Sequence, residues 1–341
     1  MQKKKPTLQD VADKANVSTA TVSRCLNNPD KVRKEVQQKI NQAIDDLGYV
    51  PDGAARALAS RKTQTIGVIV PTVDNTIFSK AIRYLQAGLT KANYTLLLAS
   101  NSYSQEEELR EVQTLLSRGI DGLVLVGAQH HPEVYKAINR YQIPLVNLWI
   151  YNPESEYSCI GFDHIKAGNQ IAKHLMDLGH KSFGVISGFR EDNDRAAERL
   201  KGVEQQLNSA GLSLDDERIV ECRYSIEQGS QSLDTLLDKH PDITAITCGN
   251  DILALGALHA AQKRGIKVPE DLSITGFDNI EIVPFLTPSL TTLNVPSRRM
   301  GEKAAKYLLR QIENKTRNIE RLELDAELII RDTTGPVLKS L

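Results

Sequence analysis

The chain has 341 residues, of which 40% are hydrophobic and 25% charged, a composition typical of a soluble globular protein with two or three compact units. It contains no apolar run of about 18 residues, and no apolar stretch follows the lysines of the N-terminal MQKKKPTLQD, so we expect neither a membrane span nor a signal peptide and place the protein in the cytoplasm. The net charge of −1 conceals a basic end, because residues 1–62 hold 12 Lys and Arg against 7 Asp and Glu. A basic head on an acidic body suits contact between the head and nucleic-acid phosphates.

Four cysteines lie far apart in the sequence without a CxxC pair. This spacing argues against a zinc site and against a disulfide framework, so we expect reduced, buried thiols. The His130-His131 pair lacks a third metal ligand nearby and is expected to lie in a surface loop, which leaves no predicted metal site.

Residues 7–27, TLQDVADKANVSTATVSRCLN, carry the pattern of two short helices joined by a tight turn. Apolar side chains recur at helical spacing in residues 8–15, Asn16 follows them, and Ser18 is a good N-cap for the second helix. The outward side chains of this second helix are short and polar, which lets a helix enter the major groove of DNA. An ordinary pair of small helices with a polar turn is the alternative.

If the segment binds DNA, its contacts divide into two sets. We expect base edges or adjacent phosphates to be contacted by Thr19, Ala20, Thr21 and Arg24. Phosphate contacts are expected from Thr7, Ser18, Ser23 and Asn27.

A third amphipathic helix follows the break at Pro29, with apolar positions from Val36 to Leu47 and Gly48 as its C-cap. The motifs Asp10-Val11-Ala12, Val17-Ser18 and Thr21-Val22-Ser23-Arg24 resemble the helix-turn-helix of the LacI/GalR family of bacterial transcription regulators. The resemblance implies that residues 1–49 form a DNA-binding headpiece. Arg33 stands where that family often has Ser or Thr, which predicts a weaker N-cap for the third helix.

Residues 49–62, YVPDGAARALASRK, contain a helix-forming piece that is too short to be stable without a partner surface. In the family that the sequence resembles, the matching segment is a hinge helix that pairs with its twin in the minor groove. Leu58 would then be the apolar wedge between base steps, with Arg56 nearby, and the hinge would span residues 50–63. An ordinary linker helix is the alternative.

From residue 65 onward, short apolar runs alternate with amphipathic helical stretches such as 78–92 and 105–118. This alternation predicts parallel sheets covered by helices on both faces. The predicted strands fall into two successive groups, 65–71, 94–100, 121–127 and 143–149, then 182–188, 218–224, 243–250 and 271–278. Two successive groups of strands predict two lobes of similar fold.

Motifs spread along residues 161–301 resemble the periplasmic-binding-protein-like body of LacI/GalR regulators, among them Gly161-Phe162-Asp163, Gly249-Asn250-Asp251 and Gly276-Phe277-Asp278. The predicted fold is therefore an all-α headpiece with a hinge helix, followed by a two-lobe α/β domain of parallel sheets over 64–341. We place the first lobe at about 64–162 and 292–324, and the second at about 163–291 and 325–341.

Ligands of open α/β sheets bind at the carboxyl ends of the strands, and two lobes that face each other form a cleft. The first lobe supplies polar and aromatic residues at its strand ends, namely Asp74, Asn75, Phe78, Tyr103, Gln129 and Trp149. The second lobe supplies residues 189–194, Arg199, Tyr224, Asn250 and Asp278. Asp163 lies near the point where the chain is expected to pass from the first lobe to the second.

The resemblance implies that Asp163, Arg199, Tyr224, Asn250 and Asp278 contact an effector, and Phe78 and Trp149 could form the opposite wall. Carboxylates, a guanidinium and aromatic faces suit a small polyhydroxylated molecule such as a sugar or sugar acid.

These residues also have structural alternatives. Asn250 and Asp278 could cap helices, Arg199 could form a helix-surface ion pair, and Trp149 could belong to the core. Arg190 and Arg195 are expected to be solvated rather than ligand-bound.

No GxSxG, GxxxxGK[ST], HExxH or GxGxxG motif occurs, so we predict neither an enzyme nor a cofactor. The predicted function is a repressor that binds a pseudo-palindromic double-stranded DNA operator as a homodimer, because one head has too little reach to specify an operator alone. Its DNA affinity would respond to the effector. The alternatives are a regulator controlled by a protein corepressor and a solute-binding protein, and the missing signal peptide argues against the latter.

Overall fold

The computed structural model describes residues 5–51 and 62–337, which divide into two compact units at residue 63. The N-terminal unit is built from short helices, α1 (Leu8–Ala15), α2 (Thr19–Asn27) and α3 (Lys34–Leu47), with a 3-10 turn at Pro29–Lys31. The core of this unit consists of buried small and aliphatic side chains, Val11, Ala12, Ala15, Val22, Cys25, Ile40 and Ala43.

The ends of these helices follow the capping chemistry of the sequence. Ser18 caps α2, Asn16 adopts a left-handed conformation with φ of 53°, and Gly48 ends α3 with φ of 60°. The side chain of Arg33 makes no capping hydrogen bond at the start of α3, as the sequence predicted. Residues 52–61 lie outside the described residues, and so do Arg56 and Leu58 of the predicted hinge helix.

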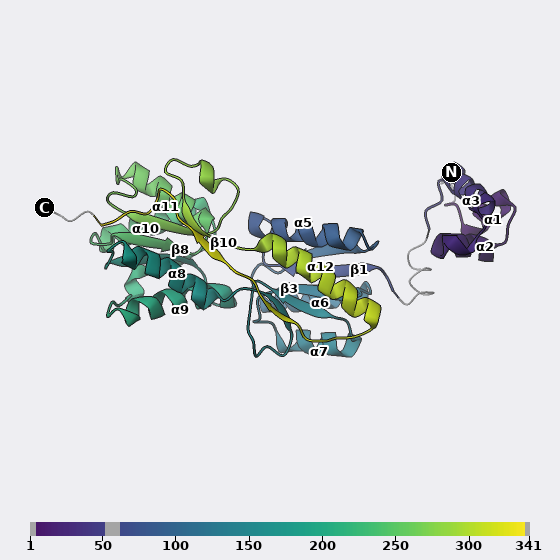
Figure 1. Ribbon diagram of the computed structural model, residues 1–341, viewed down its shortest axis with the longest axis horizontal. Helices are drawn as coiled ribbons and strands as arrows, with labels where there is room; N and C mark the ends of the chain where they lie inside the picture. The colour runs from purple at the N-terminus through teal and green to yellow at the C-terminus, as the bar shows by residue number, and fades with distance from the viewer. Residues whose placement is uncertain (1–4, 52–61, 338–341) are drawn as a thin grey trace. The chain divides into compact units, whose positions relative to one another are not determined.

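The second unit contains two parallel-dominated sheets, each covered by helices on both faces (Figure 1). The first sheet has the strand order β11-β5-β4-β3-β1-β2, all parallel. Its strands are β1 (Thr65–Val70), β2 (Thr95–Ser100), β3 (Gly122–Val126), β4 (Leu145–Leu148), β5 (Ser158–Gly161) and β11 (Arg321–Glu323). Helices α5 (Thr76–Thr90) and α12 (Ser297–Asn314) lie side by side on one face, with α6 (Gln105–Ser117) and α7 (Pro132–Tyr141) on the other (Figure 1).

The second sheet has the order β12-β10-β9-β8-β6-β7, with β12 antiparallel to β10. Its strands are β6 (Phe183–Gly188), β7 (Ile219–Cys222), β8 (Ala245–Cys248), β9 (Ser273–Asp278), β10 (Thr291–Asn294) and β12 (Glu327–Ile329). The helix pair α8 (His164–Asp177) and α9 (Asp194–Ser209) covers one face, and α10 (Ile226–Lys239) and α11 (Asp251–Lys263) cover the other. Short 3-10 turns lie at Asp216–Arg218 and Val283–Phe285.

The chain crosses from one lobe to the other three times: from β5 to α8, from β10 to α12, and from β11 to β12. The predicted two-lobe α/β fold is thus confirmed. The sequence predicted the second crossing before residue 292, whereas β10 pairs with β9 and the crossing falls at Val295 and Pro296.

Two glycines let α8 and α9 pack closely, which positions the side chains at the starts of both helices. A Cβ on Gly202 would lie 2.1 Å from the carbonyl oxygen of Ile165, and one on Gly168 would lie 2.2 Å from that of Arg199. Either substitution would push the helices apart.

Candidate functional site

The outward face of α2 in the head is polar and accessible. Ala20, Arg24 and Asn27 are exposed, and the predicted base-contacting Thr19 and Thr21 are half-buried. This leaves a surface of short side chains with one cation, as entry into a DNA groove requires.

Two of the predicted phosphate contacts also hold the helices in place. Ser18 Oγ accepts a hydrogen bond from Thr21 N at 3.2 Å, and Thr7 forms a capping box with Asp10. Thr7 and Ser18 nevertheless remain exposed, while Ser23 is half-buried.

A cleft between the two lobes of the second unit contains an inner and an outer cavity that share five lining residues, Asn75, Tyr103, Asn193, Tyr224 and Asn250. The inner cavity has a volume of about 30 Å³, enough for a water molecule or two. The outer cavity has about 790 Å³, within the range of small-molecule sites, and Asp74, Glu191 and Asp192 lie at its rim. A small ligand could therefore sit in the outer cavity and reach the inner one with one end.

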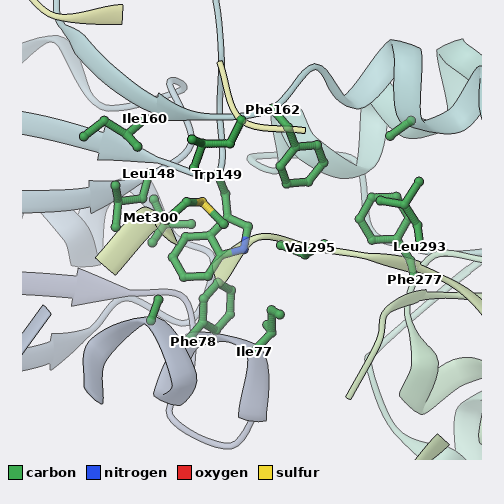
Figure 2. Packing of buried hydrophobic residues seen from close by; sticks show 14 of the residues in the cluster. Ile77, Phe78, Leu148, Trp149, Ile160, Phe162, Phe277, Leu293, Val295 and Met300 are labelled. Atoms are coloured by element: carbon green, nitrogen blue, oxygen red, sulfur yellow. The ribbon is translucent and has the colours of Figure 1, made fainter. Parts of the chain in front are cut away.

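The first lobe gives the cleft an aromatic wall. Phe78 comes from the first turn of α5, Trp149 follows β4, and their rings meet edge to face with centroids 4.9 Å apart. Both side chains are about 95% buried and both line the inner cavity, so Trp149 is at once a core residue and a cleft residue. Figure 2 shows the two rings packed together, with the indole nitrogen on the side where Phe277 of the second lobe lies.

The second lobe supplies two arginines, one turn apart on α9. Arg199 donates from Nη1 to the carbonyl of Gly249 at 2.6 Å, and its guanidinium lies 4.5 Å from the centre of the Phe277 ring. It thus contacts a backbone carbonyl and an aromatic face rather than the helix-surface carboxylate of the alternative interpretation.

The expectation for Arg195 was wrong. Only 7% of this residue is exposed, and its Nη1 donates to Asp194 at 3.0 Å and to the carbonyl of Val126 in the first lobe at 3.1 Å. It lies one turn before Arg199 on the same face of α9, so it also lines the inner cavity. Arg190 lies outside the inner cavity and pairs with Glu221.

Asp278 is the last residue of β9, and Asn250 lies between the neighbouring strand β8 and helix α11. Asn250 caps α11, since its Oδ1 accepts from Leu253 N at 2.9 Å, yet its Nδ2 is buried without a partner and lines the cavity. Asp278 is 8% exposed with a left-handed φ of 113°, and burial beside Asp251 raises the pKa of its carboxyl well above the usual range. The capping role thus holds for Asn250, while Asp278 faces the cavity.

Asp251 lies directly behind Asp278 and is fully buried. Its carboxylate accepts from Thr292 Oγ1 at 2.5 Å and from Ile280 N at 2.8 Å. A Cβ on Gly276 would lie 2.2 Å from Asp251 Oδ1, so only glycine leaves room for this carboxylate. Burial raises the pKa of Asp251 to about 7 despite these hydrogen bonds.

Tyr224 joins the cleft from the segment after β7, where its ring lies over the end of β6. A Cβ on Gly188 would meet the Tyr224 ring at 2.2 Å, which is why β6 ends in glycine there. The centroids of the Tyr224 and Tyr103 rings are 6.0 Å apart across the two lobes.

The structure does not bring Asp163 together with the other predicted effector residues. Its side chain caps α8 by accepting from Lys166 N at 2.9 Å, and it lines a separate pocket where the chain crosses between the lobes. Gln129 is exposed and does not line either cleft cavity.

The neighbouring His164, which the sequence analysis missed, takes the cleft position instead. Its ring is fully buried, stacks on Phe277 and donates from Nε2 to the carbonyl of Trp149 at 2.7 Å. Only its place next to Asp163 at the predicted crossing could have pointed to it.

Four buried polar atoms in residues that line the inner cavity have no hydrogen-bond partner. They are Trp149 Nε1, His164 Nδ1, Asn193 Oδ1 and Asn250 Nδ2. Buried polar atoms are normally paired in folded proteins, so a set of unpaired ones around one cavity indicates a place where a ligand or water binds.

The histidine pair outside the cleft also departs from expectation. His130 is buried rather than in a surface loop, with Nδ1 2.6 Å from Glu108 Oε1 and Nε2 3.1 Å from the carbonyl of Gly127. His131 caps α7.

The four cysteines are free and buried, as predicted. Across residues 5–51 and 62–337, no helix has the length and apolar composition needed to cross a membrane.

Two protein families match the sequence. Residues 63–332 match the family described as periplasmic binding proteins and sugar binding domain of LacI family, and residues 7–52 match bacterial regulatory proteins, lacI family. The chain is 35% identical over 328 residues to the HTH-type transcriptional repressor CytR of Escherichia coli strain K12, with 96% of each chain covered.

Solved structures match over the same span. The lac repressor dimer bound to operator and the anti-inducer ONPF has a TM-score of 0.86 at 25% identity, over 97% of this chain and 100% of that one. A LacI family transcriptional regulator from Enterococcus faecium with bound ribose has a TM-score of 0.72 at 26% identity, over 80% of this chain and 100% of that one.

Proposed function

Because this chain belongs to the LacI family of bacterial regulatory proteins, we propose that it is a transcriptional repressor whose affinity for operator DNA is controlled by a small polar effector. The observation that carries the proposal is the inner cavity between the lobes, whose lining residues carry four buried polar atoms without a partner, in a chain that also has a helix-turn-helix head. A regulator needs both parts, whereas an isolated DNA-binding protein needs no such cavity.

The head supports the DNA half of the proposal. Thr19, Ala20, Thr21 and Arg24 lie on the accessible side of α2 and would contact base edges, while Thr7, Ser18, Ser23 and Asn27 would contact phosphates. Ala20 can offer only apolar contact, for example to a thymine methyl. The chain would bind as a homodimer, because two heads supply the affinity and the half-site spacing of a pseudo-palindrome. Arg56 and Leu58 would act at the centre of the operator.

The cleft supports the effector half. Phe78 and Trp149 offer an aromatic face, and Arg199, Tyr224, Asn250 and Asp278 surround it with polar groups from the second lobe. Asp163 would contribute only if the lobes rearranged around the ligand. These groups suit a molecule with several hydroxyls, because hydroxyls both donate and accept hydrogen bonds.

The effector would act through the angle between the lobes. A ligand held by both walls favours one arrangement of the lobes, and that arrangement sets the separation of the two hinge segments in a dimer. Operator affinity would then follow ligand occupancy, with the sign decided by which lobe arrangement the ligand binds better.

Operator binding is tested by selecting genomic fragments with the purified chain, with and without candidate ligands. An enriched two-fold symmetric motif supports the repressor, and the genes beside it indicate the class of effector. Binding that is sensitive to salt but blind to sequence would contradict the assignment of α2 as a specific reader.

Ligand binding is tested with Trp149, the single tryptophan of the chain, as an intrinsic fluorophore inside the cleft. A sugar, sugar acid or nucleobase that binds there should change the fluorescence and raise the thermal midpoint through mass action. If no compound of such a panel does either, the cleft is not the point of control and a protein corepressor becomes the better explanation.

A further inference from the structure

His164 contacts both lobes through one side chain. It is the first residue of α8, which packs against the second sheet, yet its Nε2 lies 2.7 Å from the carbonyl oxygen of Trp149 at the end of β4 in the first sheet. A carbonyl oxygen can only accept, so Nε2 carries the proton and donates. The hydrogen bond therefore holds the first lobe to the second at the inner end of the cleft.

The other ring nitrogen has no hydrogen-bond partner. With the proton on Nε2, Nδ1 of the neutral ring is a bare acceptor, and it is buried without a partner in a residue that lines the inner cavity. Burial and the nearby Arg199 and Arg195 guanidinium groups hold the pKa of His164 well below its usual range, so the ring is neutral.

We infer that His164 couples effector binding to the contact between the lobes, by accepting a hydrogen bond from the effector at Nδ1 while Nε2 donates to the Trp149 carbonyl. The inference rests on the proposed function and assigns a role to a residue within its cleft. A hydrogen bond accepted at Nδ1 polarises the ring and makes Nε2–H a stronger donor, because linked hydrogen bonds reinforce one another. Effector occupancy thereby tightens the link between the lobes.

The same geometry specifies the chemistry of the effector's inner end. Trp149 Nε1 is a donor on a residue that lines the same cavity as His164, and on the second lobe Asn250 Nδ2 is a donor and Asn193 Oδ1 an acceptor. The two amides are oriented by their other bonds, since Asn250 Oδ1 accepts from Leu253 N and Asn193 Nδ2 donates to the carbonyl of Phe189.

Two donors and two acceptors match a pair of hydroxyls, each of which can donate and accept. A carboxylate or phosphate oxygen would face the lone pairs of His164 and Asn193 with nothing to donate. Arg195 and Arg199 line the same cavity and could receive a carboxylate, but only hydroxyls would pair all four atoms, which favours a sugar over a sugar acid that enters acid end first.

Two substitutions separate the two functions of the ring. The amide oxygen of asparagine reaches about as far as Nδ1, so His164→Asn keeps an acceptor for the ligand and loses the bond to Trp149. The amide nitrogen of glutamine reaches about as far as Nε2, so His164→Gln keeps the bond to Trp149 and displaces the acceptor. His174→Gln is the matched control, because His174 bonds Thr334 and does not line the cleft cavities.

The probes are D-ribose, D-glucose, D-gluconate and the four ribonucleosides, titrated into the full chain with Trp149 fluorescence as the readout. For the compound that binds, His164→Gln should weaken affinity roughly tenfold or more, the effect of leaving a buried hydroxyl donor unpaired. His164→Asn should change affinity by less than about threefold, yet the bound compound should no longer alter operator affinity. His174→Gln should behave as the wild type.

A spectroscopic readout on the wild type keeps the test decisive if a variant fails to fold. In protein labelled with ¹⁵N in its histidine rings, the Nδ1 signal of His164, assigned through its contacts with the Phe162 and Phe277 rings, should move when the compound binds. A compound that binds while this signal and the affinity of His164→Gln stay unchanged overturns the inference and leaves the proposed function intact. If no probe binds, the effector half of the proposed function falls together with this inference.

Discussion

The two walls of the cleft are built from different chemistry. The first lobe presents Phe78 and Trp149, packed against each other and into the core, whereas the second presents Arg199, Asn250 and Asp278 at the ends of strands and the starts of helices. The first wall is a largely apolar surface with one donor, Trp149 Nε1, and the core fixes its position. The second is a set of polar groups, of which Arg199 and Asn250 are held by hydrogen bonds to their own lobe.

The two walls therefore have different roles: the first shapes the cleft, and the second selects the ligand. An aromatic wall contributes contact area and tolerates many ligands, while buried polar groups discriminate, because a ligand that lacks the matching group leaves them unpaired. Substitutions in the first wall should therefore damage folding more than selectivity, and substitutions in the second wall should do the reverse.

The largest expected effect is on the first wall. Trp149→Ala removes a large side chain that is 4% exposed, so we expect the free energy of unfolding to fall by about 3–5 kcal/mol. Urea unfolding followed by circular dichroism measures this without the lost fluorophore. Tyr141→Ala, at a residue that is 56% exposed, is the control and should change stability by about 0.5 kcal/mol at most. A loss as small as the control's would mean that Trp149 is a ligand contact and not a core residue.

The second prediction concerns ionisation. Phe78 and Trp149 in the first wall have no titratable group, whereas the buried carboxyl of Asp251 lies next to Asn250 of the second wall. Its folded pKa of about 7 lies above the value of about 4 in the unfolded chain, so between these values the folded state keeps a proton that the unfolded state has lost. The stability that Asp251 contributes is therefore complete below about pH 4 and is lost as the pH rises to about 7.

Comparison of the wild type with Asp251→Asn measures this contribution. The stability of the wild type relative to the variant should fall by about 1 kcal/mol per pH unit between pH 5 and 7. His164 acts in the opposite direction, because its lowered pKa makes the folded state lose stability as the pH falls below about 6.5. The His164 slope is common to both proteins and cancels in the difference. The slope of Asp278 does not cancel, because Asp251 helps to raise the pKa of the Asp278 carboxyl, and it adds to the expected fall in the same direction. A difference independent of pH would show that Asp251 is ionised in the folded protein throughout.

The third prediction separates the two roles of Asn250. Asn250→Ser keeps an oxygen that can cap α11 and removes the unpartnered Nδ2, so stability should change by less than about 1 kcal/mol. Affinity for the effector should fall roughly tenfold through the lost hydrogen bond. Fluorescence titration and thermal unfolding of the same preparation measure both quantities. If the affinity for the effector stayed unchanged, Asn250 would act only as the cap of α11.

The sequence predicted the cleft residues that lie at strand ends or in the first turn of the helix that follows. Phe78, Trp149, Asn250 and Asp278 were found because parallel strands deliver the residues after them to one edge of a sheet. The alternation of apolar runs also located the central strands within one or two residues. These features depend on local periodicity, which a single sequence displays.

What the sequence did not predict depends on contacts between distant segments. Arg195 looked like a solvated charge because nothing local shows that the carbonyl of Val126 in the other lobe receives its guanidinium. His130 looked like an exposed loop residue because its partner, Glu108, lies on α6, far away in the sequence. β10 was assigned to the wrong lobe because periodicity does not say which sheet a strand joins.

The smallest expected effect concerns Tyr224, where the second wall resembles the first. Its hydroxyl makes only a long contact of 3.4 Å with Asn193 Nδ2, while its ring fits above Gly188. Tyr224→Phe should therefore change the free energy of unfolding by about 0.5 kcal/mol at most and leave effector affinity within about twofold, because the ring provides the contact. A tenfold loss of affinity in fluorescence titration would show that the hydroxyl binds the ligand directly. Tyr224 would then belong with Arg199 and Asn250 among the groups that select the effector. The second lobe would then supply selectivity through every one of these side chains, while the first lobe mainly supplies contact area.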